Sequence, residues 1–160
     1  MRSVKLDKID LRILHDLQEN GRITNVDLAK NAGISAPPCL RRVKALEEAG
    51  YIKGYHALLS PGLLGYGVTI FAMLSLDSQA DHDLNEFKEW TQDHDRIREV
   101  HMLSGEIDFL LKIVARDWDD YQSFLTHYLT AAPHVSKVKS SLAVGTTKNK
   151  PGVPIDVPGS

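Results

Sequence analysis

The sequence of 160 residues predicts an α+β protein with two domains. Three observations lead to this prediction. Apolar residues recur at helical spacing through the first 50 residues, a segment rich in glycine and proline follows at 60–67, and the rest of the chain alternates between strand and helix patterns. The charge is also uneven, because residues 1–60 carry a net charge of +3 and residues 61–160 a net charge of −5. The two parts therefore differ in pattern and in charge, as separate modules do.

The N-terminal part predicts three helices, at 6–20, 24–31 and 35–49. Each begins beside a residue type that caps helix N-termini, namely aspartate, threonine or serine. Only a tight turn at Gly33 separates the second helix from the third, which is the spacing of a helix-turn-helix. The segment 51–59 predicts a β-hairpin or strand, so this part is expected to form a winged helix-turn-helix.

The third predicted helix has one apolar side and one basic side. At about 100° per residue, Arg41 and Arg42 point away from the core. The side predicted to pack comprises Cys39, Leu40, Val43 and Leu46. Since guanidinium groups bind base edges and phosphates, we hypothesise that this helix enters the major groove of DNA. A small helical bundle whose basic residues are ordinary solvated surface is the alternative. The predicted DNA contacts are Ser35, Pro38, Arg41, Arg42, Lys44 and Lys53.

The C-terminal part predicts the order β-α-β-β-α-β. Its strands are predicted at 68–76, 97–103, 107–115 and 135–144, and its helices at 81–92 and 117–132. This order is that of the ferredoxin-like fold, a four-stranded antiparallel sheet with two helices on one face. We expect the first strand to be buried on both faces and the last strand to lie at a sheet edge. Nothing else in the chain covers the second face, which favours a homodimer formed by stacked sheets.

The predicted domain boundaries follow from these patterns. They are a winged helix-turn-helix at 1–60, a linker at 61–66, a ferredoxin-like domain at 67–148 and a flexible tail at 149–160. The tail contains three prolines after residue 150 and no periodic apolar pattern, which is typical of an extended arm.

Over about residues 5–150 the chain resembles the Lrp/AsnC family, the leucine-responsive and asparagine-regulator transcription factors. The segments that carry the resemblance are 6–14, 20–22, 27–29, 38–43, 50–52 and 104–108. The resemblance implies a transcriptional regulator that binds double-stranded DNA. It also implies a homodimer that assembles further, to an octamer, and a second domain that binds an amino-acid effector between dimers.

The resemblance also implies the positions of the effector site. They are Met102, Ser104, Gly105, Glu106, Asp108, Trp118, Leu142 and Ala143. The chemistry suits a zwitterion, because backbone N–H groups near Gly105 can bind its carboxylate and Asp108 can bind its ammonium group. Trp118 is expected to shape the pocket for the side chain. The alternative is that Gly105 only forms a turn and that Asp108 is a capping or edge residue.

Other chemistry finds little support in the sequence. The seven histidines lack the spacing of metal ligands, and there is no P-loop, nucleophile elbow or dinucleotide-binding glycine pattern. We therefore predict no catalytic residue, no metal and no cofactor. Two alternatives to an effector-responsive regulator stay open: a nucleoid-associated protein that organises DNA without an effector, and an enzyme built on the ferredoxin-like domain.

No apolar run is long enough to span a membrane, and the N-terminus lacks the apolar stretch of a signal peptide. A cytoplasmic location and no membrane partner are therefore expected. The single cysteine, Cys39, excludes an internal disulfide and is expected to be a buried apolar residue.

Overall fold

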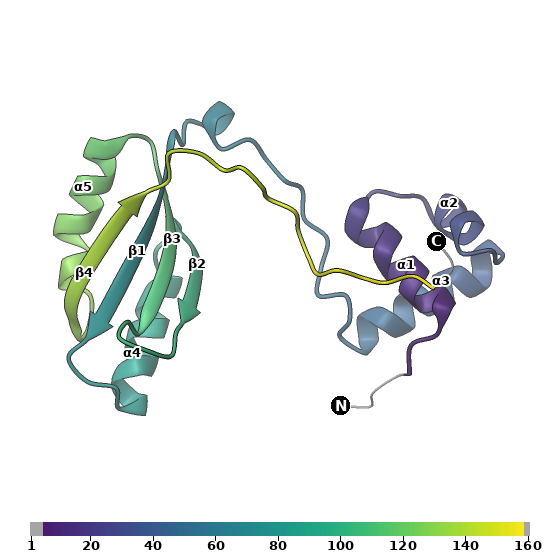
Figure 1. Ribbon diagram of the computed structural model, residues 1–160, viewed down its shortest axis with the longest axis horizontal. Helices are drawn as coiled ribbons and strands as arrows, with labels where there is room; N and C mark the ends of the chain where they lie inside the picture. The colour runs from purple at the N-terminus through teal and green to yellow at the C-terminus, as the bar shows by residue number, and fades with distance from the viewer. Residues whose placement is uncertain (1–4, 159–160) are drawn as a thin grey trace. The chain divides into compact units, whose positions relative to one another are not determined.

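The computed structural model describes residues 5–158. The chain forms two compact units, each with its own core (Figure 1). The first unit comprises Met1–Leu58 together with Lys148–Ser160, and the second comprises Leu59–Thr147. The chain therefore passes between the units twice, once before the second unit in the sequence and once after it.

The first unit contains the three predicted helices, α1 (Lys8–Glu19), α2 (Asn25–Asn31) and α3 (Ala36–Glu48). Asp7 caps α1 in a capping box, since its carboxylate accepts the Asp10 N–H at 2.9 Å. The predicted helices and their starts are thus confirmed to within two residues.

The core of the first unit joins all three helices. Its fully buried side chains include Ile13 of α1, Leu28 of α2, and Cys39 and Leu46 of α3. Burial raises the pKa of the Cys39 thiol, so this cysteine packs as a small apolar residue, as predicted. Leu40 was expected in the same packed side, but it is 45% exposed. It lies at the margin of the stripe, where the helical wheel separates packed from solvated positions poorly.

The predicted hairpin or strand at 51–59 is wrong. Among the described residues no strand lies between α3 and the first strand of the second unit. Aromatic and β-branched residues suggested a strand, but a strand needs a hydrogen-bonding partner, and this segment has none in the single chain. Tyr55 is held from its side chain instead, because its hydroxyl donates to Glu47 Oε1 at 2.9 Å.

The second unit has the predicted β-α-β-β-α-β order. Its elements are β1 (Val68–Leu76), α4 (Asp81–Gln92), β2 (Ile97–Met102), β3 (Phe109–Ala115), α5 (Trp118–His127) and β4 (Val135–Leu142). Short 3₁₀ turns precede β1 at Gly62–Leu64 and follow α5 at Leu129–Ala131. The sheet order is β2-β3-β1-β4 with every pair antiparallel, so the ferredoxin-like fold and the edge position of the last strand are confirmed.

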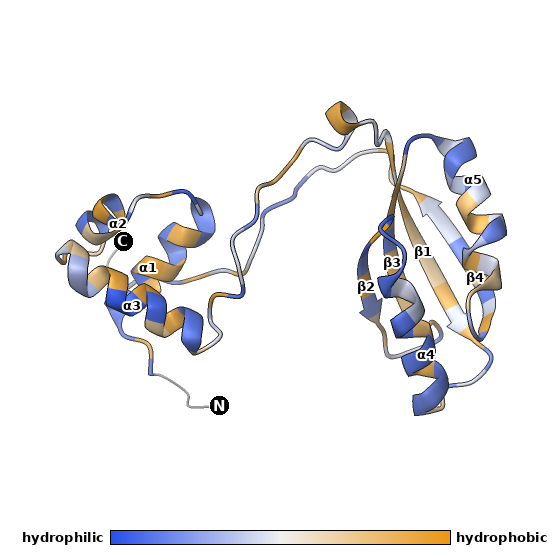
Figure 2. Ribbon diagram, turned by 180° about the vertical axis from the view of Figure 1, so that it is seen from behind, coloured by the Kyte–Doolittle hydropathy of each residue, from blue (hydrophilic) through white to orange (hydrophobic). Residues whose placement is uncertain are grey.

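Helices α4 and α5 lie against the same face of the sheet (Figure 2). Phe87 of α4 and Tyr121 of α5 are fully buried, and they pack on inward-facing strand residues such as Ile70 and Leu111. The Tyr121 hydroxyl forms a hydrogen bond with the hydroxyl of Ser140 on β4, which satisfies the polar end of a buried ring. This face supplies the core of the second unit.

The other face of the sheet is only partly buried. Along β1 burial alternates, so Ile70 and Leu74 are inaccessible whereas Phe71 is 36% exposed and Met73 is intermediate. The expectation that β1 is buried on both faces is therefore wrong for the single chain. That expectation was based on a continuous apolar run, which predicts that both faces of the strand are apolar but not that both are covered. An apolar sheet face without a cover remains.

The C-terminal segment, predicted as a flexible tail, contacts α1 in the structure. The Gln18 side chain forms two hydrogen bonds with the backbone of Val153, and Lys150 lies 3.1 Å from Glu19 Oε1. The sequence prediction did not include these contacts, because a segment without periodicity does not reveal where it packs.

Within residues 5–158 no helix is long and apolar enough to cross a membrane.

Candidate DNA-binding and ligand-binding sites

Helix α3 is held by the turn that connects it to α2. Gly33 adopts φ +69°, a left-handed conformation that glycine accepts readily, and the Ile34 N–H donates to the Ala29 carbonyl at 3.0 Å. The Asn25 side-chain amide donates to the Ala36 carbonyl at 3.0 Å. Both bonds fix the start of α3 relative to α2, so the helix is presented rigidly.

One side of α3 faces solvent. Arg41 and Lys44 are exposed on it, and Ser35 is exposed at the N-cap, where its side chain makes no capping hydrogen bond. Pro38 is half-buried in the first turn. Lys53 is exposed, but it lies in the segment that lacks the predicted strand.

Arg42 is bound within the first unit, unlike Arg41. Its Nη1 donates to Asp7 Oδ2 at 2.8 Å and to Asp10 Oδ1 at 2.7 Å, both at the start of α1. The pKa of Asp7 lies below its ordinary value, first because its carboxylate accepts the Asp10 N–H and then because Arg42 is close. The prediction that Arg42 reaches DNA does not agree with this geometry, since its guanidinium attaches α3 to the N-terminus of α1. The helical wheel gave the direction of the side chain but not its partners.

The predicted effector positions near the β2–β3 connection form an exposed turn. Ser104, Gly105 and Glu106 are exposed, and Met102 at the end of β2 is 60% exposed. Gly105 has φ +141°, which residues with a side chain rarely adopt. The backbone of this turn is therefore accessible to a ligand.

Asp108, in contrast, is part of the sheet anchor. It is 8% exposed, and its two carboxylate oxygens accept the Leu76 N–H and the Gln79 side-chain amide, each at 2.8 Å. Both carboxylate oxygens are thus engaged within the chain, and the role of Asp108 as the partner of an ammonium group stays a prediction. The alternative role of a capping or edge residue describes its geometry, because it fixes the end of β1.

The remaining effector positions lie at the start of α5 and the end of β4. Trp118 and Leu142 are each 44% exposed. Ala143 is half-buried, and its N–H donates to the Thr69 carbonyl at 2.9 Å. Trp118 also packs on Tyr121 at a centroid distance of 5.5 Å, which holds the indole at the surface.

The two groups of effector positions lie at opposite ends of the sheet. Met102 pairs with Phe109, and Phe109 pairs with Leu74 near the end of β1, whereas Ala143 binds Thr69 near its start. Leu74 and Thr69 are five positions apart along β1, which is about 17 Å at roughly 3.4 Å per residue. Figure 1 shows the same separation, with the β2–β3 turn at one end of the sheet and the start of α5 at the other. One chain therefore does not assemble the predicted site.

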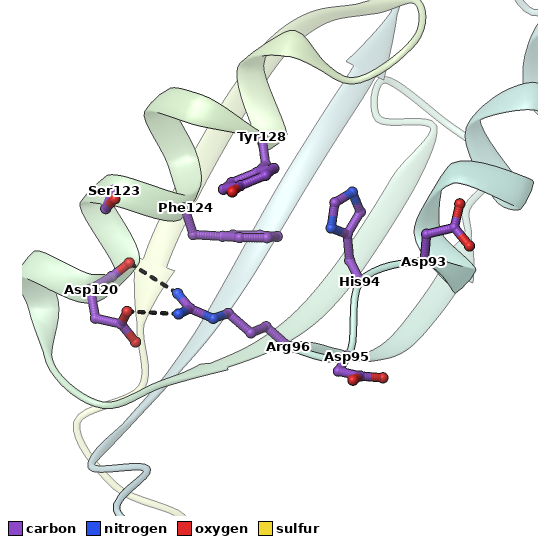
Figure 3. Close-up of a pocket in the computed structure, with 8 residues that line it drawn as sticks. All are labelled: Asp93, His94, Asp95, Arg96, Asp120, Ser123, Phe124 and Tyr128. Atoms are coloured by element: carbon purple, nitrogen blue, oxygen red, sulfur yellow. Dashed lines mark hydrogen bonds and ion pairs between the residues drawn. The ribbon is translucent and has the colours of Figure 1, made fainter.

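A cavity that the sequence did not predict lies between α5 and the loop before β2 (Figure 3). Its volume is about 390 Å³, and His94, Phe124 and Tyr128 form its aromatic wall. Arg96 crosses it and pairs with Asp120 at 2.8 Å. None of the predicted site residues lines it. Arg96 and Asp120 form an ion pair with each other, which indicates a structural role in joining α5 to the loop before β2.

In the part of the chain that is described, no group of three or more histidine, cysteine, aspartate or glutamate residues could hold a metal ion.

Comparison with known proteins agrees with this division into two units. Residues 6–53 match the winged helix-turn-helix DNA-binding family, and residues 69–153 match the Lrp/AsnC ligand-binding domain. The fold and the matched domains define a DNA-binding transcriptional regulator with a ligand-binding domain, and not an enzyme. The chain belongs to the Lrp/AsnC family, which its sequence had suggested.

Curated relatives match along almost the whole chain. A leucine-responsive regulatory protein of Rhizobium meliloti (strain 1021) is 49% identical over 146 residues, which cover 91% of this chain and 94% of the relative. A Bkd operon transcriptional regulator of Pseudomonas aeruginosa is 37% identical over 151 residues, covering 94% and 99%.

Solved structures share the fold. A transcriptional regulator from Neisseria meningitidis in complex with L-Met superimposes with a TM-score of 0.90 at 34% identity, covering 95% of this chain and 98% of that one. An AsnC family transcriptional regulator from Agrobacterium tumefaciens gives a TM-score of 0.86 at 32% identity, covering 93% and 97%.

Proposed function

We propose that this regulator acts as a homo-oligomer that binds double-stranded DNA through α3 and responds to an amino acid bound between two copies of the second unit. The observation that carries the proposal is the separation of the effector positions. The turn at 104–106 and the side chains of Trp118 and Leu142 lie at opposite ends of one sheet, so two copies are needed to bring them together.

For DNA, the proposal assigns contacts to the exposed side of α3. Arg41 and Lys44 reach bases or phosphates, Ser35 and Pro38 approach the backbone at the helix start, and Lys53 contacts a flanking phosphate. Arg42 supports the helix from behind through α1. Because the whole chain has a net charge of −2, one copy offers weak attraction to phosphate, and paired copies reading two half-sites strengthen it.

For the homodimer, the proposal uses the partly buried sheet face. Phe71 and Met73 on β1 and Leu110 on β3 are neighbours on this face, because Met73 pairs with Leu110 and Phe71 with Lys112. Stacking two such faces removes these apolar side chains from water, and the Glu99–Lys112 ion pair at 2.7 Å lies beside Phe71 on the same face. Dimers that meet through the ends of their sheets then form the larger assembly, an octamer.

The proposed ligand is a free amino acid. Exposed N–H groups around Gly105 bind its carboxylate, and Glu106 replaces Asp108 as the acceptor for its ammonium group, because Glu106 is exposed in the same turn. Trp118 and Leu142 of the other copy enclose the side chain. The L-Met complex of the Neisseria protein supports this class of ligand.

The ligand is tested by a screen of the 20 common amino acids against the purified protein. We expect at least one to raise the melting temperature of the second unit, because a ligand that binds only the folded state stabilises it. The same amino acid should change the molar mass in solution or the affinity for DNA. No response in any of the three measurements would overturn the proposed effector.

The dimer interface is tested with Phe71→Glu. A carboxylate at this position should convert the dimer to a monomer, because Lys112 opposite it is already paired with Glu99 and burying a further charge is costly. Glu89→Gln on the solvent side of α4 is the control. An unchanged molar mass in Phe71→Glu by sedimentation would show that this face is not the interface.

A further inference from the structure

The described C-terminal segment is attached to α1 by specific polar contacts. The Gln18 side-chain amide donates to the Val153 carbonyl at 2.7 Å, and its oxygen accepts the Val153 N–H at 3.0 Å. Both backbone groups of one residue are thus paired by one side chain, as a neighbouring strand would pair them. Lys150 lies 3.1 Å from Glu19 one position along the helix.

The segment also forms one wall of an apolar groove in the first unit. Leu11, Leu14 and Leu17 of α1 line one side of this groove, Tyr51 and Ile52 line another, and residues 153–156 close it. Its volume is about 450 Å³. Ile155 and Val157 are half-buried as the segment continues along α1. The segment therefore covers apolar surface of α1 beside residues 51–55.

Gly152 is fitted to this contact. Its φ of +75° disfavours any residue with a side chain. A Cβ atom at this position would lie 1.9 Å from Gln18 Oε1 and 2.2 Å from Gln18 Cδ. A larger residue must displace the Gln18 amide, which breaks both hydrogen bonds to Val153. The contact thus depends on one glycine.

The segment connects directly to the predicted ligand positions. Leu142 ends β4 and Ala143 follows it, and Val153 comes only ten positions after Ala143. This is the second of the two chain connections between the units. A short tether therefore joins the end of β4 to the segment docked on α1, and the N-terminus of α1 binds Arg42 of α3.

We propose that residues 149–158 act as a C-terminal strap that docks on α1 and couples the ligand-bound state of the second unit to the DNA-binding unit. The coupling rests on the proposed ligand response. The docking rests on the contacts of Gln18, Gly152 and Val153. Releasing the strap leaves ligand binding intact and removes its effect on DNA affinity.

The test compares the full-length wild type with Gly152→Val, with Gly145→Ala as the matched control. A Cβ at Gly145 meets no atom within 4 Å, and Gly145 lies on the same tether before the docked part. Hydrogen exchange of α1 reports docking. Calorimetric titration with L-methionine and with L-leucine reports ligand binding. Fluorescence anisotropy on a duplex selected from genomic fragments gives the ratio of DNA dissociation constants without and with the bound amino acid.

In Gly152→Val we expect faster exchange at the C-terminal end of α1, an unchanged affinity for the amino acid, and a DNA ratio that falls towards unity. Gly145→Ala should behave as the wild type. The proposed strap would be overturned if, in Gly152→Val, both the hydrogen exchange of α1 and the ratio of DNA dissociation constants stayed at wild-type values. It would also be overturned if the ratio fell only together with a change in molar mass while the hydrogen exchange of α1 was unchanged. If no amino acid changes the DNA affinity of the wild type, the proposed ligand response is overturned, and the coupling with it. The comparison of hydrogen exchange still decides whether the strap docks on α1.

Discussion

The two units of this regulator present their predicted sites in different ways. In the first unit the exposed side of α3 is complete within one chain, and a local pattern of apolar and basic residues was enough to locate it. In the second unit the effector positions are divided between the two ends of the sheet. The comparison indicates that the exposed helix face is formed within one copy, whereas the predicted ligand positions come together only if two copies contribute, as we propose.

The largest expected effect is on DNA affinity. Replacing Arg41 and Lys44 with alanine removes the two exposed cations of α3, and each base contact contributes about 1–3 kcal/mol. We therefore expect the dissociation constant for a selected duplex to rise at least about 30-fold. The salt dependence should also weaken by about one phosphate for each lost contact. Anisotropy titrations at several salt concentrations measure both.

Lys88→Ala on α4 is the control for this double variant, because the Lys88 ammonium group donates to Asn85 of its own helix at 3.2 Å and lies outside the DNA-binding unit. Unchanged affinity and salt slope in the α3 variant would mean that this helix does not contact DNA. The exposed side of α3 would then not be the DNA-binding site of the first unit.

A smaller effect is expected for Asp108→Asn. This change replaces one carboxylate oxygen with an amide NH₂ in a buried site where Leu76 N–H and the Gln79 amide both donate. One donor loses its acceptor, so the second unit should lose about 1–3 kcal/mol of unfolding free energy. Thermal and urea unfolding measure this loss. A protein of unchanged stability that fails to bind the amino acid would instead place Asp108 in the pocket.

The smallest effect is expected for Arg42→Ala. The guanidinium is about one-third exposed, and ion pairs with such exposure contribute at most about 1 kcal/mol. The first unit should therefore be slightly less stable, while the salt slope of DNA binding stays at the wild-type value. A slope that decreases as it does for Arg41 would show that Arg42 leaves Asp7 and Asp10 to bind phosphate.

The contribution of this ion pair should also depend on pH. Because the folded state lowers the pKa of Asp7 below its ordinary value of 3.8, the stabilisation is present above that pH. It is lost as the pH falls through the lower pKa of the folded state. The stability difference between wild type and Arg42→Ala should therefore decrease below pH 3.8, which unfolding measured from pH 7 down to pH 2 can follow.

The sequence predicted the local parts of this structure well. Caps at Asp7 and Asp117, apolar spacing and turn residues act over a few positions, and they placed the helices and strands. The contacts of Arg42 with Asp7, of Asp108 with Leu76 and of Gln18 with Val153 join residues more than 30 positions apart. No periodic pattern encodes such pairs, which explains why the sequence did not predict these contacts of Arg42, Asp108 and the C-terminal segment.

The wing and the second sheet face illustrate a second limit. Residues 51–59 and the side of β1 that carries Phe71 have the composition of paired or covered strands, yet a single chain supplies neither a partner strand nor a covering layer. The composition of a segment indicates that it can pair or pack. Whether it does so depends on a partner that the single chain does not supply.

The central claim is that each ligand pocket takes its parts from two copies, and complementation tests it most directly. Gly105→Val damages the turn and Trp118→Ala damages the opposite end, so each variant alone should lose amino-acid binding by calorimetry. When the two variants are unfolded together and refolded as mixed oligomers, a shared pocket can combine the intact turn of one chain with the intact Trp118 of the other. We predict that the mixture regains binding sites with wild-type affinity. Mixed oligomers that bind no amino acid would contradict the account, because a pocket within one chain always carries one of the two changes.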